Sequence, residues 1–389
     1  HHHFFQSLTR AVPAAQNQEL FGWLSTLYPL WSKITASMLQ TAAQMAAAEL
    51  ILSGCTTASN HSYLFPNNCT LDDEIRAIQA IGLRFQANRG SMSIGESKGG
   101  LPPDHLVESE AFILRDSQRL IEQYHDNDRY AMLRITLAPC SPFSVSPALM
   151  RESAAMARTY PGVRLHTHLA ENVSDVNYSL EKFGQTPGEY AESVGWLGDD
   201  VWHAHCVKLS DRSLTKFSET GTGVAHCPCS NMRLASGIAP IRTMLDRHIP
   251  VGLGVDGSAS NDTGHLMQEA RMAMLAARVR DAAPGALTAR EALAIAATGG
   301  AQVLGRDDIG AIAPNMAADF IAINLDRPAL AGASYDPVAA LLFCHVDKVD
   351  YSFINGRRVV DKGRLTTLEL QKLIQTHRQA HETLMNSMP

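Results

Sequence analysis

Short apolar runs alternate with amphipathic stretches from about residue 50 to residue 256. The apolar runs are β-prone and predict strands, which lie at residues 55–64, 83–91, 132–139, 164–169, 201–207, 223–227 and 251–255. The amphipathic stretches between them predict helices, which lie at residues 71–81, 108–124, 147–159, 188–194, 210–220 and 241–247. Strands that alternate with helices of this length are typical of βαβ units and a parallel sheet.

A closed barrel accounts for this alternation better than an open sheet. One further strand at the start of the chain, ending at His3, brings the strand–helix units to eight. Eight such units over roughly 250–300 residues match a (β/α)8 barrel. The alternative, a doubly wound open sheet, usually carries a glycine-rich phosphate turn, and the sequence contains none. We therefore predict an α/β fold whose (β/α)8 TIM barrel spans residues 1–312 and carries the catalytic site.

The pattern changes after a predicted helix at residues 288–304. Strands are predicted at residues 318–325 and 349–360, with Asn355-Gly356 as a hairpin turn, and a helix follows at residues 367–385. We interpret residues 313–365 as the C-terminal portion of a small β-sandwich-like domain and residues 366–389 as a C-terminal helix. The chain opens at His1 without an initiator methionine, so we expect the remaining strands of the small domain in a missing N-terminal segment.

Composition and charge narrow the class of partner. The formal net charge of -6 provides no basic patch for a nucleic-acid backbone, which favours a small-molecule substrate. No run approaches the roughly eighteen apolar residues of a membrane-spanning helix, so no membrane partner is expected. The seven cysteines are scattered and odd in number, which predicts free thiols and a reducing, cytoplasmic location.

Histidines gather near the ends of the predicted strands. Side chains two residues apart in a strand face the same side, so each His-x-His pair would share one face. These pairs are His1 and His3, His166 and His168, and His203 and His205, and the isolated His226 also lies at a strand end. In a barrel, the inward face at the carboxyl ends of the strands is the floor of the active site.

Four of these positions carry ligands that suit zinc. Zinc prefers imidazole and carboxylate ligands, and a catalytic site keeps one position open for water. His1, His3, His168 and Asp256 would together supply such a set. A lone histidine is more often a core or surface residue, and histidines at a terminus also fit a purification tag. The joint pattern, and the direct continuation into Phe4 without a linker, favour the metal site.

Three residues would carry the chemistry beside the metal. Glu171 lies three residues after His168, where its carboxylate would move a proton between water and substrate, although a solvated carboxylate at a helix start is the alternative. His205 would hold the attacking water or polarise the substrate, and Asp256 would accept a proton. The predicted fourth strand ends at residues 134–140 without the lysine that bridges two metals, which favours one zinc ion. Iron or manganese would accept the same ligands.

The motifs His1-x-His3, His168-x-x-Glu171, His205-Cys206 and Asp256-Gly257 resemble those of the amidohydrolase superfamily, and specifically its aminohydrolase branch. The resemblance covers nearly the whole chain. It implies one zinc ion on the four proposed ligands, Glu171 as proton shuttle and His205 beside the attacking water. It also implies a homo-oligomer and hydrolytic removal of an amino group from a purine-type ring.

Further segments resemble the members of that branch that act on 8-oxoguanine. They lie at residues 1–10, 89–93, 166–172, 226–234 and 256–262. Guanine deaminases of that branch carry an Arg-Phe pair where this chain has residues 140–143, and adenosine-analogue deaminases tend to carry a His in place of Cys140. The resemblance therefore argues against plain guanine and against adenosine analogues. Guanine, isoxanthopterin and s-triazines stay as alternative substrates. A catalytically silent scaffold would have lost one of the site residues, and a hydrolase of amides or lactones would usually carry the absent lysine.

A purine-type ring needs a flat apolar slot with a few polar groups at its edge. Candidates for that lining are Gln6, Trp23, Cys140 and Asn261. Trp23 would equally fit a helix face packed in the core, and Cys140 a small buried apolar position. The loop at residues 93–103 is rich in Gly and Ser and would be either a mobile lid or a plain surface connection.

Overall fold

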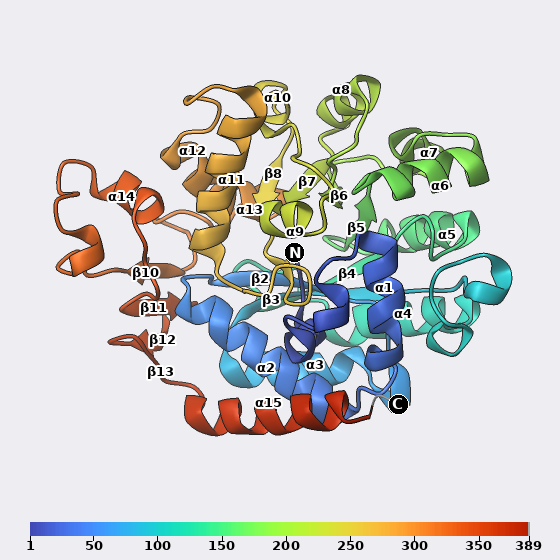
Figure 1. The fold of residues 1–389 in the computed structure, drawn as a ribbon, viewed down its shortest axis with the longest axis horizontal. Helices are drawn as coiled ribbons and strands as arrows, with labels where there is room; N and C mark the ends of the chain where they lie inside the picture. Colours follow the sequence, from blue (N-terminus) through green and yellow to red (C-terminus); the bar gives the residue numbers. More distant parts are fainter. Residues whose placement is uncertain (388–389) are drawn as a thin grey trace.

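Parallel strands curl around the centre of the molecule, and helices cover the outside of the sheet (Figure 1). This computed structural model describes residues 1–387, so residues 388–389 of the predicted C-terminal segment lie outside the described residues. The strands are β1 (His2–His3), β2 (Thr57–Ser62), β3 (Arg84–Ser91), β4 (Leu133–Pro139), β5 (Arg164–Leu169), β6 (Val201–His205), β7 (Gly223–His226), β8 (Val251–Leu253) and β9 (Asp256–Gly257).

The order of the strands closes the sheet into a barrel. Hydrogen-bonded neighbours run β8-β7-β6-β5-β4-β3-β2-β1-β9, and all pairs are parallel. Strand β9 follows β8 after only Gly254 and Val255, so the two ends of the order are one strand with a short interruption. The predicted (β/α)8 TIM barrel is confirmed. Its carboxyl-terminal rim brings together residues from the start, middle and end of the barrel sequence.

Helices follow the strands as the alternation predicts. They are α3 (Leu71–Ile81), α4 (Glu110–Tyr124), α5 (Pro147–Ala157), α6 (Val173–Phe183), α7 (Pro187–Ser193), α8 (Asp211–Thr220), α9 (Pro228–Arg233), α10 (Ile241–Asp246), α11 (Leu266–Asp281), α12 (Ala289–Ala294) and α13 (Gly300–Val303), with a π turn at Ile295–Gly299 between the last two. Residues 93–103, the predicted lid or surface connection, contain one 3-10 turn at Glu96–Lys98. Its role as a lid stays a prediction.

Two helices before β2 did not feature among the predicted elements. These are α1 (Leu20–Trp31) and α2 (Ala36–Leu52). Their buried residues recur at helical spacing, as Leu20, Trp23, Leu24, Leu27 and Tyr28 do in α1, so the sequence carried a signal for both helices. Helix α1, the 3-10 helix Phe4–Thr9 and the residues around Phe143 and Leu234 share a second hydrophobic cluster beside the carboxyl-terminal rim. This cluster forms the apolar wall of the site.

A small antiparallel sheet lies beside the barrel (Figure 1). It consists of β10 (Phe320–Ala322), β11 (Tyr351–Ile354), β12 (Arg357–Asp361) and β13 (Arg364–Leu365), in that order. Asn355 and Gly356 have positive φ and join β11 to β12, as the predicted hairpin requires. Helix α14 (Pro337–Phe343) lies at the same end of the molecule, and the last helix, α15 (Leu370–Met385), packs against α2.

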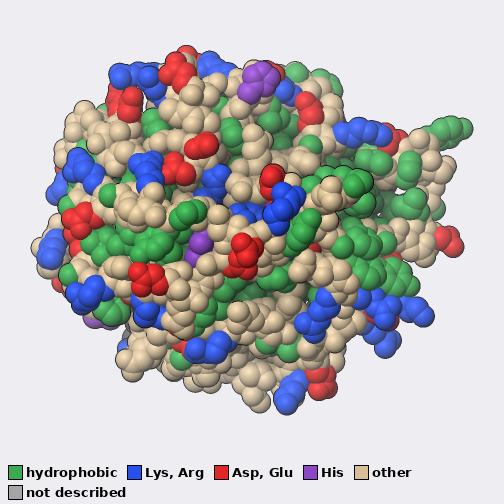
Figure 2. Space-filling view, turned by 180° about the vertical axis from the view of Figure 1, so that it is seen from behind, with side chains coloured by type: hydrophobic (Ala, Val, Ile, Leu, Met, Phe, Trp, Pro, Cys, Tyr) green, Lys and Arg blue, Asp and Glu red, His purple; other side chains and the backbone are tan. Residues whose placement is uncertain are grey.

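No helix within residues 1–387 has the length and apolar character needed to cross a membrane. The seven cysteines are all unpaired. Hydrophobic side chains gather on the surface near the small sheet and α14, on the right of the space-filling view (Figure 2). The exposed large hydrophobic residues at this end are Ile312, Leu325, Tyr335, Val338 and Phe343.

Candidate active site

Four side chains from three distant parts of the sequence meet at the carboxyl-terminal rim of the barrel. His1 and His3 come from the first strand, His168 from β5 and Asp256 from β9, and one ligand atom of each lies within 4.8 Å of the others. The Nε2 atom of His3 lies 3.1 Å from Nε2 of His168 and 3.2 Å from Oδ1 of Asp256. The Nε2 atom of His1 lies 3.4 Å from the same oxygen. The structure thus brings the four predicted metal ligands together.

Hydrogen bonds behind the site leave the Nε2 lone pairs free. The Nδ1 atom of His3 donates to the carbonyl oxygen of His61 at 2.7 Å, and Nδ1 of His168 donates to that of Cys140 at 2.6 Å. A carbonyl oxygen only accepts, so Nδ1 carries the hydrogen and Nε2 is available as a ligand. The buried Nε2 of His1 has no hydrogen-bond partner within residues 1–387. Three imidazole nitrogens and one carboxylate oxygen, directed at one point, fit a divalent metal ion such as zinc.

Glu171 and His205 lie beside this cluster. The Nε2 atom of His205 is 3.4 Å from Oε2 of Glu171 and 3.9 Å from Oδ2 of Asp256. On the far side, Nδ1 of His205 donates to Oδ1 of Asn231 at 2.8 Å, which orients the ring. Glu171 is buried, and its Oε1 atom has no partner in the described part of the chain. Both side chains line one cavity together with His3, His168 and Asp256.

The pKa values of the Glu171 and Asp256 carboxyl groups are shifted in opposite directions. Burial, together with the nearby charges of Asp256 and Asp175, raises the pKa of Glu171 well above its usual value. Burial acts in the same direction on Asp256, but the adjacent imidazoles of His3 and His205 hold its pKa well below the usual value. Paired titratable groups with divergent pKa values mark the acid and base positions of a site.

The expectation that His203 and His205 share one face is wrong. His203 Nε2 bonds to the carbonyl oxygen of Trp196, and its ring packs near Phe217 of helix α8, whereas His205 reaches the metal cluster. The backbone of His205 has φ 72°, which ends the strand and breaks the alternation of faces. A pattern of period two cannot anticipate such a turn.

Glu171 and His205 line a small, largely apolar cavity. Gln6, Trp23 and Cys140, three of the four predicted substrate-binding residues, line it. The Gln6 amide donates to the Tyr63 hydroxyl at 3.3 Å and accepts from the Ala259 N–H at 3.3 Å. A Cβ at position 257 would lie 1.8 Å from Gln6 Oε1, so Gly257 allows this close approach.

The fourth predicted residue, Asn261, lies outside the cavity lining. Its side-chain amide donates to the carbonyl oxygen of Val255 at 2.7 Å and to Glu269 Oε2 at 2.9 Å. These bonds hold the turn after β9 rather than a ligand. The sequence pattern did not single out Tyr63, whose ring stands edge-on to His3 with the centroids 5.0 Å apart. Its position two residues after His61, directly beyond the end of β2, was the available signal.

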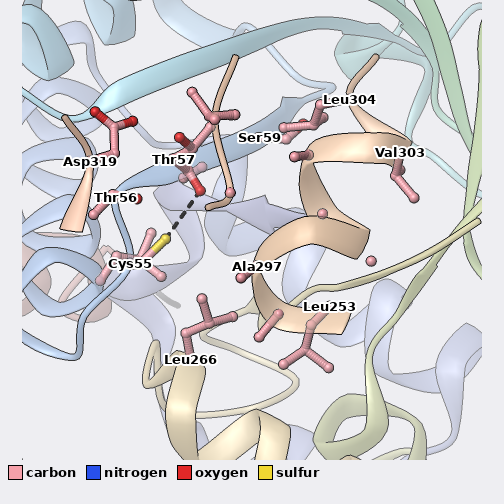
Figure 3. Close-up of a pocket in the computed structure, with 18 of the residues that line it drawn as sticks. Cys55, Thr56, Thr57, Ser59, Leu253, Leu266, Ala297, Val303, Leu304 and Asp319 are labelled. Atoms are coloured by element: carbon pink, nitrogen blue, oxygen red, sulfur yellow. Dashed lines mark hydrogen bonds between the residues drawn. The ribbon is translucent and has the colours of Figure 1, made fainter. Parts of the chain in front are cut away.

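A second cavity, of about 350 Å³, lies elsewhere. Figure 3 shows its walls, where Thr57 and Ser59 of β2 face Leu253 of β8 and Val303 of α13. Along this cavity, residues 57–59 of β2 pair only with β3, and β8 pairs only with β7, within the described residues. The lining includes His1 but not Glu171, His205 or Asp256.

Comparisons with known proteins agree with this geometry. The model of the amidohydrolase family matches residues 1–359. An 8-oxoguanine deaminase of Pseudomonas aeruginosa is 47% identical over 99% of the chain and 86% of its own length. An isoxanthopterin deaminase from an unknown prokaryotic organism is 34% identical over 96% of the chain and 81% of its own length.

Solved structures are similar as well. The atrazine chlorohydrolase of Arthrobacter aurescens TC1, solved in complex with zinc, superposes with a TM-score of 0.94 at 33% identity. The alignment covers 98% of this chain and 86% of the chlorohydrolase. The chlorohydrolase therefore shares the fold of this chain, and the zinc in its structure is a metal of the type that the ligand set fits.

Proposed function

The chain belongs to the amidohydrolase family, and on that premise we propose that it removes the amino group from a purine-type ring by hydrolysis. We propose 8-oxoguanine as the substrate, with urate and ammonia as the products. The observation that carries the proposal is the convergence of four metal-type ligands beside Glu171 and His205 at the floor of an apolar slot. The 47% identity to an 8-oxoguanine deaminase supports the choice of ring.

His1, His3, His168 and Asp256 would hold one divalent ion, which we propose is zinc. The fit rests on the unpartnered Nε2 of His1 and on the free Nε2 lone pairs of His3 and His168. When bound, such an ion acts as a Lewis acid and makes a nucleophilic water available near neutral pH. Iron and manganese accept similar ligands, so metal analysis of the purified protein tests the choice of zinc.

The chain's own residues would move the protons. Glu171 would take one proton from the attacking water and deliver it to a ring nitrogen, and its raised pKa suits a group that holds this proton. A C–O bond then forms at the ring carbon that bears the amine. Asp256 Oδ2, which faces His205, would accept the second proton and pass it to the amine, so that the C–N bond breaks and ammonia leaves. His205 would orient the attacking water.

Gln6, Trp23 and Cys140 would contact the substrate ring and select among ring types. Gln6 is the polar member, and its amide is held between Tyr63 and the backbone of Ala259. Trp23 is fixed by a hydrogen bond of 3.0 Å from its Nε1 to the carbonyl oxygen of Ala259, and would stand along the ring. Asn261 would act on this pocket only indirectly, through the turn that it holds.

Ammonia release from the zinc-loaded protein tests the proposal. 8-Oxoguanine, guanine, isoxanthopterin and an amino-s-triazine are compared in parallel. We expect the kcat/KM for 8-oxoguanine to exceed the others by at least about tenfold, a difference of about 1.4 kcal/mol in transition-state binding. A higher value for isoxanthopterin would favour the second candidate, which the 34% identical relative supports. Ammonia from none of them would refute the proposed reaction.

Two further expectations concern the surroundings of the enzyme. We propose a homo-oligomer, and the exposed hydrophobic side chains near α14 are the surface that would be covered (Figure 2). Light scattering on the purified protein measures this, and a monomer at micromolar concentration would refute it. A cytoplasmic location also stays a prediction, which fractionation of the source cells would test.

A further inference from the structure

His166 is a buried histidine that the proposed reaction does not use. It lies on β5 two residues before His168, and it is fully buried. Its ring stacks on Trp202 of β6 with the centroids 3.5 Å apart and the planes at 10°. Its Nε2 atom lies 3.0 Å from Nδ1 of His1, one of the four proposed ligands.

The hydrogen bonds of His166 determine which of its nitrogens carries the hydrogen. The Nδ1 atom lies 3.2 Å from the carbonyl oxygen of Trp202, and a carbonyl oxygen only accepts, so Nδ1 is the donor. Within residues 1–387 no carboxylate pairs with the buried ring, and an isolated buried cation is costly, so the ring is neutral. Its Nε2 atom therefore has a lone pair and accepts.

The same reasoning then fixes the tautomer of His1. Because His166 Nε2 accepts, Nδ1 of His1 must carry the hydrogen and donate it. The other nitrogen of His1, Nε2, is left with a free lone pair, and this is the atom that faces Asp256 Oδ1 at 3.4 Å. In His3 and His168 the Nδ1 atom donates directly to a carbonyl oxygen, whereas in His1 the Nδ1 atom donates to a second histidine, His166.

We propose that His166 is a positioning residue that holds His1 in the tautomer and orientation needed to bind the metal. Two hydrogen bonds connect the carbonyl oxygen of Trp202 through His166 to His1, and we call this chain of hydrogen bonds the relay. The proposal rests on the metal site of the proposed function. It adds a residue that touches neither metal nor substrate and acts only through His1.

Cobalt binding tests the relay without measuring turnover. The metal-free full chain is titrated with Co²⁺, whose visible absorption responds to the number and geometry of its ligands. We expect His166→Phe, which keeps a ring against Trp202 but removes the acceptor, to weaken Co²⁺ binding about 10–100-fold and to change the absorption band. We expect His166→Gln, whose amide would both donate and accept, to restore affinity and spectrum.

His203→Phe is the matched control. His203 is also fully buried, on the neighbouring strand and two residues before His205, but it bonds to Trp196 and not to the cluster. We expect its cobalt affinity and spectrum to match those of the unaltered chain. If His166→Phe does not fold, His166→Asn, which is too short to reach His1, is compared with His166→Gln.

Three outcomes would overturn the relay. The first is unaltered cobalt affinity and spectrum in both His166→Phe and His166→Asn. The second is a second bound ion per chain that disappears in these variants, because His1, His61 and His166 would then themselves form a metal site. The third is an unaltered chain that binds no cobalt, which would refute the proposed metal site as well. Cobalt binding without ammonia release would refute only the proposed reaction.

Discussion

Glu171 shows how a single residue acquires its role from its neighbours. It follows β5, and Asp175 Oδ2 accepts its backbone N–H at 2.9 Å, which fixes the backbone there. The side chain is buried beside His205, and one carboxyl oxygen has no partner within residues 1–387. Leaving a buried polar atom unpaired costs roughly 1–3 kcal/mol, so the position favours a ligand that will pair with it.

We expect Glu171→Gln to lower kcat for ammonia release by about 10²–10⁴-fold, because the amide has nearly the same shape but cannot relay a proton. Zinc content should stay unchanged, since Glu171 is not one of the four clustered ligands. Kinetics and metal analysis of the same preparation measure both. Glu192→Gln, on the exposed face of α7, is the control and should behave like the unaltered chain. Full turnover in Glu171→Gln would exclude the proton-shuttle role.

At the scale of elements, a buried ion pair connects the barrel with the small sheet. Arg84, the first residue of β3, donates from Nε and Nη2 to the two carboxyl oxygens of Asp319 at 2.7 and 2.8 Å. Asp319 precedes β10 and also accepts from the backbone N–H of Asn355 at 2.6 Å. Both side chains are almost completely buried. The pair therefore anchors the hairpin of the small sheet to the amino-terminal end of barrel strand β3.

We expect Asp319→Asn to destabilise the fold by about 3–5 kcal/mol, because it leaves the Arg84 guanidinium buried without its counter-charge. The control is Asp307→Asn, which breaks the exposed pair with Arg129 and should cost at most about 1 kcal/mol. Urea unfolding of the two variants measures the difference. Equal midpoints would show that the buried pair does not hold the two parts together.

At the scale of the whole molecule, the metal site connects segments that are far apart in the sequence. His1 and His3, His168 and Asp256 come from the first, fifth and last strands of the barrel. The segment with His1 and His3 forms only a short strand, which pairs with β2 at one position and with β9 at two. A bound ion would therefore strengthen the contact between the first and last strands, where the barrel closes.

We expect removal of the metal by a chelator to abolish ammonia release and to lower the free energy of unfolding. An ion that binds only the folded chain contributes about 2.7 kcal/mol at a hundred times its Kd. Thermal unfolding with and without added zinc measures the shift, and re-addition should restore it. In His168→Ala, which lacks one ligand, added zinc should have a much smaller effect. The same unfolding midpoint in the loaded and metal-free chain would contradict this coupling.

The sequence by itself determined the barrel and predicted the residues that meet at its carboxyl-terminal rim. Strands and helices have local periods, so the alternation of apolar runs and amphipathic stretches predicted the closed sheet. The spacing of His1 and His3, and the positions of His168, Glu171 and Asp256 at strand ends, followed from the same periods. Parallel strands bring their carboxyl ends to one rim, and so the structure brings these residues together.

Only the tertiary structure decided which polar groups support that rim. It turned His205 away from His203 through a left-handed backbone, placed Asn261 on Glu269, and set His166 behind His1. These contacts join residues from different segments of the fold, or depend on one backbone angle at the end of a strand. A local pattern of faces carries no information about such partners, because they are selected by packing and by the need of buried polar groups for hydrogen bonds.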